Sequence, residues 1–313
     1  MNYKYSRLYF SPVAPLECVT LCSRCKQMNR GERGGMAAAL ALTSALSFGA
    51  ADFLGGLAAR RCSALTVTGV SQLAGLMVLV PALLVFDGVL SMAAIWTGAL
   101  AGLAGAGGLV LYLRSLAIGP MSLVAPVAAV VGAALPVAAG VVAGERPPRL
   151  ALAGVAIGLA AVWLATGQGR RRNSAHAHAQ GPLLALLAGL AFGAFFIFLD
   201  ATPADSGAWP LVAARGASLI VLTVAATSLR RPLPSRKILP VAAVSGGLDM
   251  AANLLFLAAT RTGLLTLTAL LASLYPVVVV LLAWRLMAER LTRAQLLGVV
   301  MALAAVGLIA AAP

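Results

Sequence analysis

The strongest constraint on the fold is an internal duplication with a constant offset. Glu145-Arg146 recurs as Glu289-Arg290, 144 residues further on, and Phe48-Gly49-Ala50 recurs as Phe192-Gly193-Ala194 at the same distance. Other positions that keep this offset are Tyr112 with Phe256, Gly119 with Gly263, Arg149 with Arg293, and Gly154-Val155 with Gly298-Val299. An offset that holds over so many positions indicates a tandem duplication.

The duplicated unit has the composition of a membrane protein. Hydrophobic residues make up 61% of the chain, charged residues only 10%, and the mean hydropathy is +0.97. Soluble domains have about 45–50% apolar and about 25% charged residues. The net charge of +14 would suggest nucleic acid in a soluble protein, but here the basic residues lie between apolar segments and near the N-terminus. We predict an integral membrane protein whose partner is the lipid bilayer, with no nucleic acid.

Apolar segments separated by short polar or Pro/Gly stretches recur along the chain. Each has about 17–23 residues, enough at about 1.5 Å per residue to cross a hydrocarbon layer of about 30 Å. The predicted segments are 37–58, 65–86, 92–113, 121–142, 150–166, 183–200, 209–229, 238–258, 264–286 and 294–312. The sequence therefore predicts an all-α integral membrane protein with ten transmembrane helices, five in each copy.

An odd number of helices per copy requires the second copy to insert upside down. The predicted fold is therefore two inverted five-helix repeats, which are typical of transporters that alternate access to a site near the membrane midplane. The predicted organisation is a basic N-terminal extension (1–35), a first repeat (36–166), a basic linker (167–181) and a second repeat (182–313). We expect the extension to be disordered or a mispredicted start, with Met28 or Met36 as the real one, because it lacks the apolar core of a signal peptide.

Each half resembles the EamA repeat of the drug/metabolite transporter superfamily, over residues 36–313. The resemblance rests on Gly144-Glu145-Arg146, echoed by Ala288-Glu289-Arg290, on a last helix with Gly154 or Gly298, and on fourth helices with Pro126, Pro136 and Pro276. It implies a ten-helix carrier, an exporter of small metabolites or drugs. Frequent Ala, Gly and Arg are typical of GC-rich bacterial DNA, so we expect a multi-pass protein of the bacterial plasma membrane.

The two Glu-Arg pairs have a structural and a functional interpretation, and we favour the structural one. A carboxylate just before a helix is stabilised by the dipole at the helix N-terminus, and Arg anchors the membrane interface. Glu145 and Glu289 each precede the last helix of their copy. We expect them to stabilise helices and not to bind substrate.

Polar side chains inside the apolar segments are the candidates for a substrate site, because an ionisable group in hydrocarbon is costly unless it is paired or faces water. Among the acidic residues, only Asp52 and Asp249 lie well within predicted helices, and Arg215 is the one basic residue placed similarly. Asn253 follows Asp249 by four residues and shares its helix face. The predicted substrate-binding set is Asp52, Gln72, Tyr112, Arg215, Asp249, Asn253 and Tyr275.

Two interpretations of this set stay open. In the first, its residues line the translocation path; in the second, Arg215 pairs with Asp249 or with Asp52 and only fixes helix packing. Asp52 is also similar to the first-helix carboxylate at which related small multidrug pumps exchange protons for cations, so protons are a candidate coupling ion. Its repeat partner is Phe196, so this comparison rests on one carboxylate instead of two.

Signals for an enzyme are few. His176 and His178 lie in the basic linker, whereas an intramembrane enzyme needs His or carboxylate groups that face one another within helices. Cys18, Cys22 and Cys25 are closely spaced, but a zinc site would need a fourth ligand that the extension lacks. We predict no enzyme, no catalytic residue, no cofactor and no metal. The alternative functions are a flippase for a lipid-linked substrate or a non-transport scaffold, and the protein is expected to be a monomer or homodimer.

Charge and resemblance give opposite predictions of sidedness. Basic residues of the second half gather in the connections on one side, which would place those connections in the cytoplasm and both termini outside. The resemblance implies cytoplasmic termini, and the basic extension agrees with it. The residues counted on the first side are Arg170, Arg171, Arg172, Arg230, Arg231, Arg236, Lys237, Arg285, Arg290 and Arg293, against Arg261 on the other.

Overall fold

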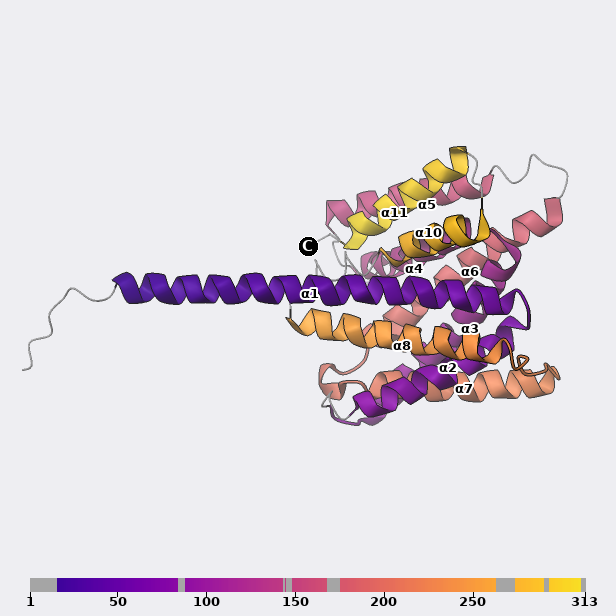
Figure 1. The fold of residues 1–313 in the computed structure, drawn as a ribbon, viewed down its shortest axis with the longest axis horizontal. Coiled ribbons are helices and arrows are strands. Elements are labelled where there is room, and N and C mark those ends of the chain that lie inside the picture. Colours follow the sequence, from indigo (N-terminus) through magenta and orange to yellow (C-terminus); the bar gives the residue numbers. More distant parts are fainter. Residues whose placement is uncertain are drawn as a thin grey trace, which may run out of the picture.

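The computed structural model describes residues 16–83, 88–142, 144, 148–167, 175–262, 274–289 and 293–310. Within these residues every regular element is a helix, and no strand occurs. A chain of this hydropathy has to satisfy its backbone hydrogen bonds within each segment when it enters a bilayer, and a helix does so. Figure 1 shows the helices packed side by side in one bundle.

The described helices follow the two halves of the chain. In the first half they are α1 (Leu16–Ala59), α2 (Ala64–Ala82), α3 (Met92–Ile118), α4 (Met121–Val142) and α5 (Arg149–Gly167). In the second half they are α6 (Ala175–Asp200), the short 3-10 helix η2 (Ala204–Ser206), α7 (Trp209–Ser228), α8 (Leu239–Thr262), α10 (Tyr275–Met287) and α11 (Arg293–Ala310).

Seven of the described helices are long and apolar enough to span a membrane. They lie in α1, α2, α3, α4, α6, α7 and α8, and the apolar cores of α5, α10 and α11 are shorter. The first part of the predicted segment 264–286 lies outside the described residues. The structure therefore shows an all-helical protein with multiple membrane-spanning candidates, and the number ten stays a prediction.

Part of the N-terminal extension, from Leu16 onward, belongs to the described residues. The structure continues α1 back to Leu16, and this part of the helix projects beyond the bundle in Figure 1. No proline interrupts Leu16–Ala59, and many residues of its first part, such as Leu, Lys, Arg, Gln, Glu and Met, are good helix formers. A helix nucleated in the bundle can therefore propagate outward through the extension.

The two halves interleave through close contacts between helices. Ser44 Oγ donates to the Ala252 carbonyl at 2.7 Å and Ser245 Oγ donates to the Ala51 carbonyl at 2.7 Å, so α1 and α8 pack antiparallel. Ser115 Oγ on α3 donates to the Gly181 carbonyl on α6 at 2.6 Å. Small residues and hydroxyl-to-carbonyl bonds are the common means of joining helices in a membrane. Most described helices of one half therefore lie against the other half.

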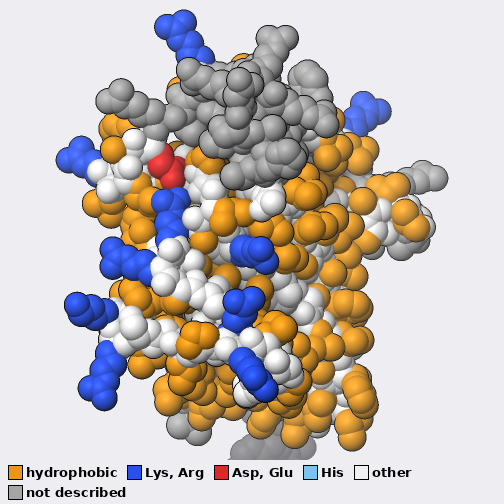
Figure 2. Space-filling model, turned by 90° about the vertical axis from the view of Figure 1, so that its right-hand side faces the viewer, with side chains coloured by type: hydrophobic (Ala, Val, Ile, Leu, Met, Phe, Trp, Pro, Cys, Tyr) orange, Lys and Arg blue, Asp and Glu red, His pale blue; other side chains and the backbone are white. Residues whose placement is uncertain are grey.

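Basic side chains gather at one end of the bundle, which we call the basic end. There α1, α3, α7 and α10 end and α4 and α8 begin, and Figure 2 views this end directly. The starting point of α1 and the last turn of α11 lie at the opposite end (Figure 1). The exposed basic residues of the basic end are Arg60, Arg61, Arg114, Arg230, Arg231, Arg236, Lys237, Arg285 and Arg293.

Candidate functional site

Arg215 joins three helices inside the bundle. From α7, its Nη1 donates to Oε1 of Gln72 on α2, and its Nη2 donates to Oδ2 of Asp249 on α8 at 2.5 Å. The Arg215 side chain is 11% exposed and that of Asp249 is 29% exposed. Asn253 lies one turn further along α8 and donates its Nδ2 to the Asp249 carbonyl at 2.8 Å. We call Gln72, Arg215, Asp249 and Asn253 the arginine cluster.

The arginine cluster is balanced internally. Of the two predicted ion pairs of Arg215, the structure forms the one with Asp249. A paired guanidinium and carboxylate avoid most of the cost of burying each charge alone, and the Gln72 amide occupies a further donor. The geometry fits a packing role, and it also fits a site whose pair opens for a charged ligand.

Asp52 belongs to a second group, which combines its carboxylate with aromatic side chains of several helices. Tyr112 on α3 donates its hydroxyl to Asp52 Oδ2 on α1 at 2.9 Å. Phe48, one turn before Asp52, packs against Tyr275 on α10 with ring centroids 6.0 Å apart, and Tyr112 meets Phe192 on α6 edge to face at 5.7 Å. Among the described residues no ion pair to Asp52 occurs. We call these five residues the aspartate cluster.

Each of the seven residues of the predicted substrate-binding set belongs to one of these two clusters. Asp52, Tyr112 and Tyr275 fall in the aspartate cluster and the other four in the arginine cluster. The sequence analysis missed Phe48 and Phe192 as neighbours of this site. Phe48 could have been found, because it precedes Asp52 by four residues and so shares its helix face.

Glu289 corrects the expectation for the Glu-Arg pairs. It was expected to stabilise the helix that follows it, α11; instead its carboxylate caps α4, in the other half of the chain. Oε1 accepts from the Met121 backbone N–H at 3.0 Å, and Oε2 accepts from the Ser122 N–H at 3.1 Å and from Ser122 Oγ at 2.6 Å. The first N–H groups of a helix have no partner within it, so a carboxylate there satisfies them and the dipole together. Glu145, Arg146 and Arg290 lie outside the described residues.

A comparison with protein families decides what kind of protein this is. The model of the EamA-like transporter family matches residues 35–167 and again residues 179–311. The chain belongs to the EamA-like transporter family. As a family member it is a multi-pass membrane protein of a transporter family and not of an enzyme family, as the resemblance in each half implied.

Comparisons with individual proteins give information about the fold only. Fourteen chains of solved structures match this EamA-like chain. One of them, described only as the crystal structure of a protein, is 18% identical over 87% of this chain and 96% of its own, with a TM-score of 0.58. A search of curated proteins finds no match. The comparisons therefore support the helical architecture and leave the substrate open.

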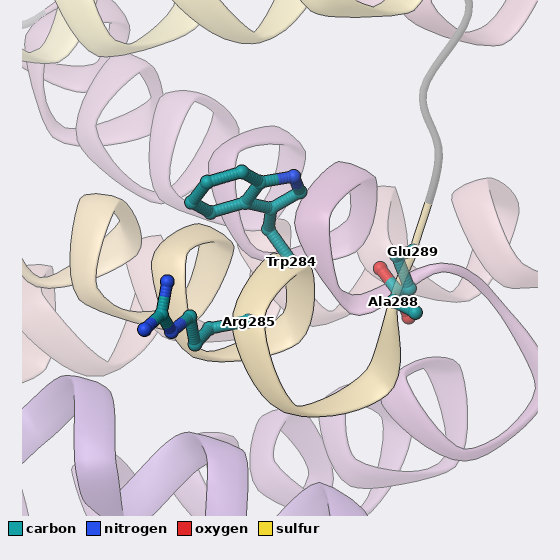
Figure 3. Close-up of a pocket in the computed structure, with 4 residues that line it drawn as sticks. All are labelled: Trp284, Arg285, Ala288 and Glu289. Atoms are coloured by element: carbon teal, nitrogen blue, oxygen red, sulfur yellow. The ribbon is translucent and has the colours of Figure 1, made fainter.

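A depression in the surface of this EamA-like protein lies away from both clusters. It has a volume of about 410 Å³ and is lined by Trp284, Arg285, Ala288 and Glu289 at the end of α10 (Figure 3). None of the seven predicted site residues lines it. Within the described part of the chain, no group of His, Cys, Asp or Glu side chains could hold a metal ion.

Proposed function

We propose that this protein is a secondary transporter with ten transmembrane helices in two inverted repeats. Family membership supports a transporter, and the directions of the helices support the inversion. Tyr112 lies beside Asp52 and Leu116 beside Arg60, so α3 runs parallel to α1. The Ser115–Gly181 contact places the end of α3 beside the first part of α6, so α6 runs the opposite way. The first helices of the two repeats, α1 and α6, are therefore antiparallel.

The observation that carries the proposal is that both polar clusters combine residues of the two repeats. The Gln72–Arg215 contact and the Phe48–Tyr275 contact each join one repeat to the other. In an inverted-repeat carrier the substrate site lies between the repeats, and each repeat moves against the other around it. We place the substrate site at these clusters and propose export of small metabolites or drugs from a bacterial cell across its plasma membrane.

Charge narrows the substrate class. Asp52, Asp249 and Arg215 together carry one net negative charge when all are ionised, and the charge of Asp52 is the one without an ion-pair partner among the described residues. Aromatic faces attract cations, and four rings belong to the aspartate cluster. An amine or another organic cation is therefore the expected substrate group, and a proton is the expected competitor at Asp52.

The test is ligand-induced stabilisation of the purified full chain. A ligand that binds only the folded state raises the midpoint of thermal unfolding. We would compare amino acids, sugars, nucleosides and cationic drugs, and we expect the amine-bearing compounds to raise it. Asp52→Asn and Asp249→Asn should each abolish the increase, because both carboxylates belong to the proposed site, whereas Asp205→Asn, an exposed acidic residue outside both clusters, should keep it.

A double variant separates a site from a packing contact. Asp249→Asn leaves Arg215 without its carboxylate and should lower the basal unfolding midpoint. Adding Arg215→Gln removes the uncompensated charge and should restore much of that midpoint. If the double variant regains stability and still responds to the ligand, the pair only fixes packing. If no compound stabilises the unaltered protein, a lipid-linked substrate or a non-transport scaffold becomes the better interpretation.

A further inference from the structure

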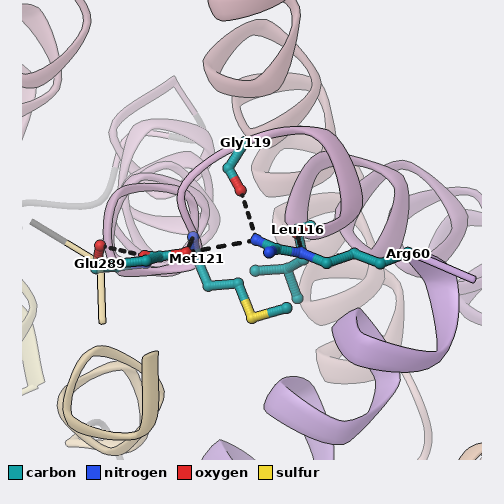
Figure 4. Close-up of polar contacts among 6 residues, drawn as sticks. Arg60, Leu116, Gly119, Met121 and Glu289 are labelled. Carbon is teal, nitrogen blue, oxygen red and sulfur yellow. Dashed lines mark hydrogen bonds and ion pairs between the residues drawn. The ribbon is translucent and has the colours of Figure 1, made fainter. Parts of the chain in front are cut away.

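Glu289 connects the second repeat to the start of a first-repeat helix at the basic end. Its side chain is only 13% exposed and accepts three hydrogen bonds from the first two residues of α4 (Figure 4). The backbone aims it there: Ala288 ends α10 with φ of 52°, the left-handed conformation that a non-glycine residue rarely adopts. Gly144, at the equivalent position of the first repeat, also has a positive φ, of 90°.

Arg60 extends this contact to two more helix ends. Its Nη2 lies 3.4 Å from Glu289 Oε1, its Nε donates to the Leu116 carbonyl at 3.2 Å, and its Nη2 donates to the Gly119 carbonyl at 3.1 Å. A cation at the C-terminus of α3 and an anion at the N-terminus of α4 each match the local helix dipole. Charge-assisted hydrogen bonds are about twice as strong as neutral ones. The ends of α1, α3 and α10 and the start of α4 are thus held together.

The burial of α4 shows that the bundle is tightly packed at the basic end. Every residue from Met121 to Gly132 is buried, so neighbours surround the first half of the helix on all faces. Towards the other end Val141 is 47% exposed and Val142 is 90% exposed. The tightly packed half of α4 is the one that Glu289 caps.

We propose that Glu289, with Arg60, is a latch that closes the basic end of the transport path and releases once in each cycle. This inference rests on the proposed function, because only a carrier has to open its two ends in turn. Separation of α10 from α4 would expose the path at the basic end, and it requires all the contacts of Glu289 to break. The latch therefore sets how often this end opens.

The test measures opening directly, with a cysteine behind the latch. Ala283 on α10 is fully buried, and its carbonyl accepts the Glu289 N–H. We would introduce Ala283→Cys into the full chain with its four native cysteines replaced by serine, and measure its reaction with a bulky hydrophilic maleimide in lipid nanodiscs. Glu289→Gln should raise the rate about tenfold, since the charge-assisted bonds become neutral ones. Arg285→Gln, an exposed change on the same helix, should leave the rate unchanged.

Two further variants keep the result interpretable. Ser122→Ala removes only the hydroxyl donor and should give a smaller increase in rate than Glu289→Gln. Ala305→Cys, a buried position on α11 without contact to the latch, serves as a reference reporter. A rate that rises equally at both introduced cysteines would mean general loss of packing and would overturn the latch, as would an unchanged rate at position 283 in the Glu289→Gln variant.

The experiment separates the latch from the proposed function, because the reaction of the cysteine needs no substrate. If Glu289→Gln raises the rate but no compound stabilises the protein or is transported by it, Glu289 holds the basic end closed, but the transporter proposal fails and the release of the latch in a transport cycle fails with it. If transport is established and the rate does not change, only the latch fails.

Discussion

At the scale of single residues, Asp52 is the group whose chemistry the structure defines best. Its one hydrogen-bonding partner among the described side chains is the Tyr112 hydroxyl, and the Tyr112 ring in turn packs against Phe192. A carboxylate in such surroundings is neutral or charged according to what occupies the site. Under the proposed function it would therefore bind a proton or a cationic substrate, but not both together.

Asp52→Asn should abolish accumulation driven by the proton gradient. With a ligand identified by thermal stabilisation, we expect proteoliposomes of the unaltered protein to accumulate it against a gradient when a pH difference is imposed. The variant should lose both this accumulation and passive exchange of the ligand, because an amide takes up no proton and carries no charge to bind a cation. Tyr112→Phe retains the carboxylate and serves as the control, with accumulation preserved. Accumulation by Asp52→Asn at the unaltered rate would exclude Asp52 as the coupling residue.

The sequence singled out the unusual polar residues and offered two acidic partners for Arg215, but it could not decide between these partners. The rarity of charged side chains in apolar segments singled out Asp52, Arg215 and Asp249, and the structure places each of them in a polar or aromatic cluster. Their division into two clusters depends on helix packing, which the pattern of one helix does not contain. The partner of Glu289 was missed for a related reason: backbone N–H groups leave no mark on the sequence.

At the scale of helices, glycine decides how closely α3 approaches its neighbours. A Cβ on Gly102 would lie 2.6 Å from the Ala214 Cα on α7, and a Cβ on Gly98 would lie 2.9 Å from the Pro210 Cα. Ser218 Oγ also donates to the Gly102 carbonyl at 2.7 Å. Gly98 and Gly102 therefore have a packing role, because small residues let helices approach closely.

Gly102→Val should therefore destabilise the protein far more than the same change elsewhere on α3. The opposing atoms at Gly102 are backbone, which cannot move aside, so α7 has to shift and the Ser218 bond breaks. We expect a loss on the order of 1–3 kcal/mol, typical of overpacking, seen as a lower midpoint of thermal unfolding. Gly107→Val is the matched control, because nothing lies within 4 Å of its built Cβ. Equal losses in the two variants would mean that helix propensity, and not close packing, explains the effect.

The observed end of a helix can differ from the end that hydropathy alone predicts. The predicted segment 92–113 stops before Arg114 and Ser115, two polar residues, but α3 continues to Ile118. Arg114 is exposed at the basic end, and Ser115 is buried because its hydroxyl reaches the Gly181 carbonyl. Polar residues in the last turn thus belong to the helix when water or another helix satisfies them. The left-handed turn at Ala288 was equally hidden, although Gly144 at the equivalent position is the residue that such turns favour.

At the scale of the whole molecule, the duplication predicts more than any single motif does. A constant offset over both halves predicted two related helical units, and the family match covers both. It did not predict that the halves would interleave, with α1 against α8 and α3 against α6 and α7. Interleaving follows from burial: each repeat has apolar helix faces and lone serine hydroxyls that find their partners in the other repeat. A single repeat would leave these groups without partners.

The arrangement of helix ends gives a prediction of sidedness. The start of α1 and the end of α11 lie on the same side of the bundle, opposite the basic end that carries Arg230, Arg231, Arg236 and Lys237 between α7 and α8 (Figure 1). Reporters fused to the two termini should therefore locate both termini in the same compartment. A thiol label at Ser235→Cys should locate position 235 in the opposite compartment. Cytoplasmic retention of basic connections further predicts that position 235 faces the cytoplasm.

Fluorescent-protein and alkaline-phosphatase fusions at the two termini, with impermeant thiol labelling at position 235, decide between the two predictions of orientation. Cytoplasmic labelling at 235 with phosphatase activity at the C-terminus would show that the connections of the bundle orient the chain. The reverse result would show that the basic residues of the N-terminal extension, such as Arg24 and Lys26, hold that end inside and override the basic end. Removing residues 1–35, so that the chain starts at Met36, should then change the orientation, because only the extension would oppose the charge of the connections. Termini found in different compartments would contradict the helix directions themselves, and with them the inverted-repeat arrangement on which the proposed transport cycle depends.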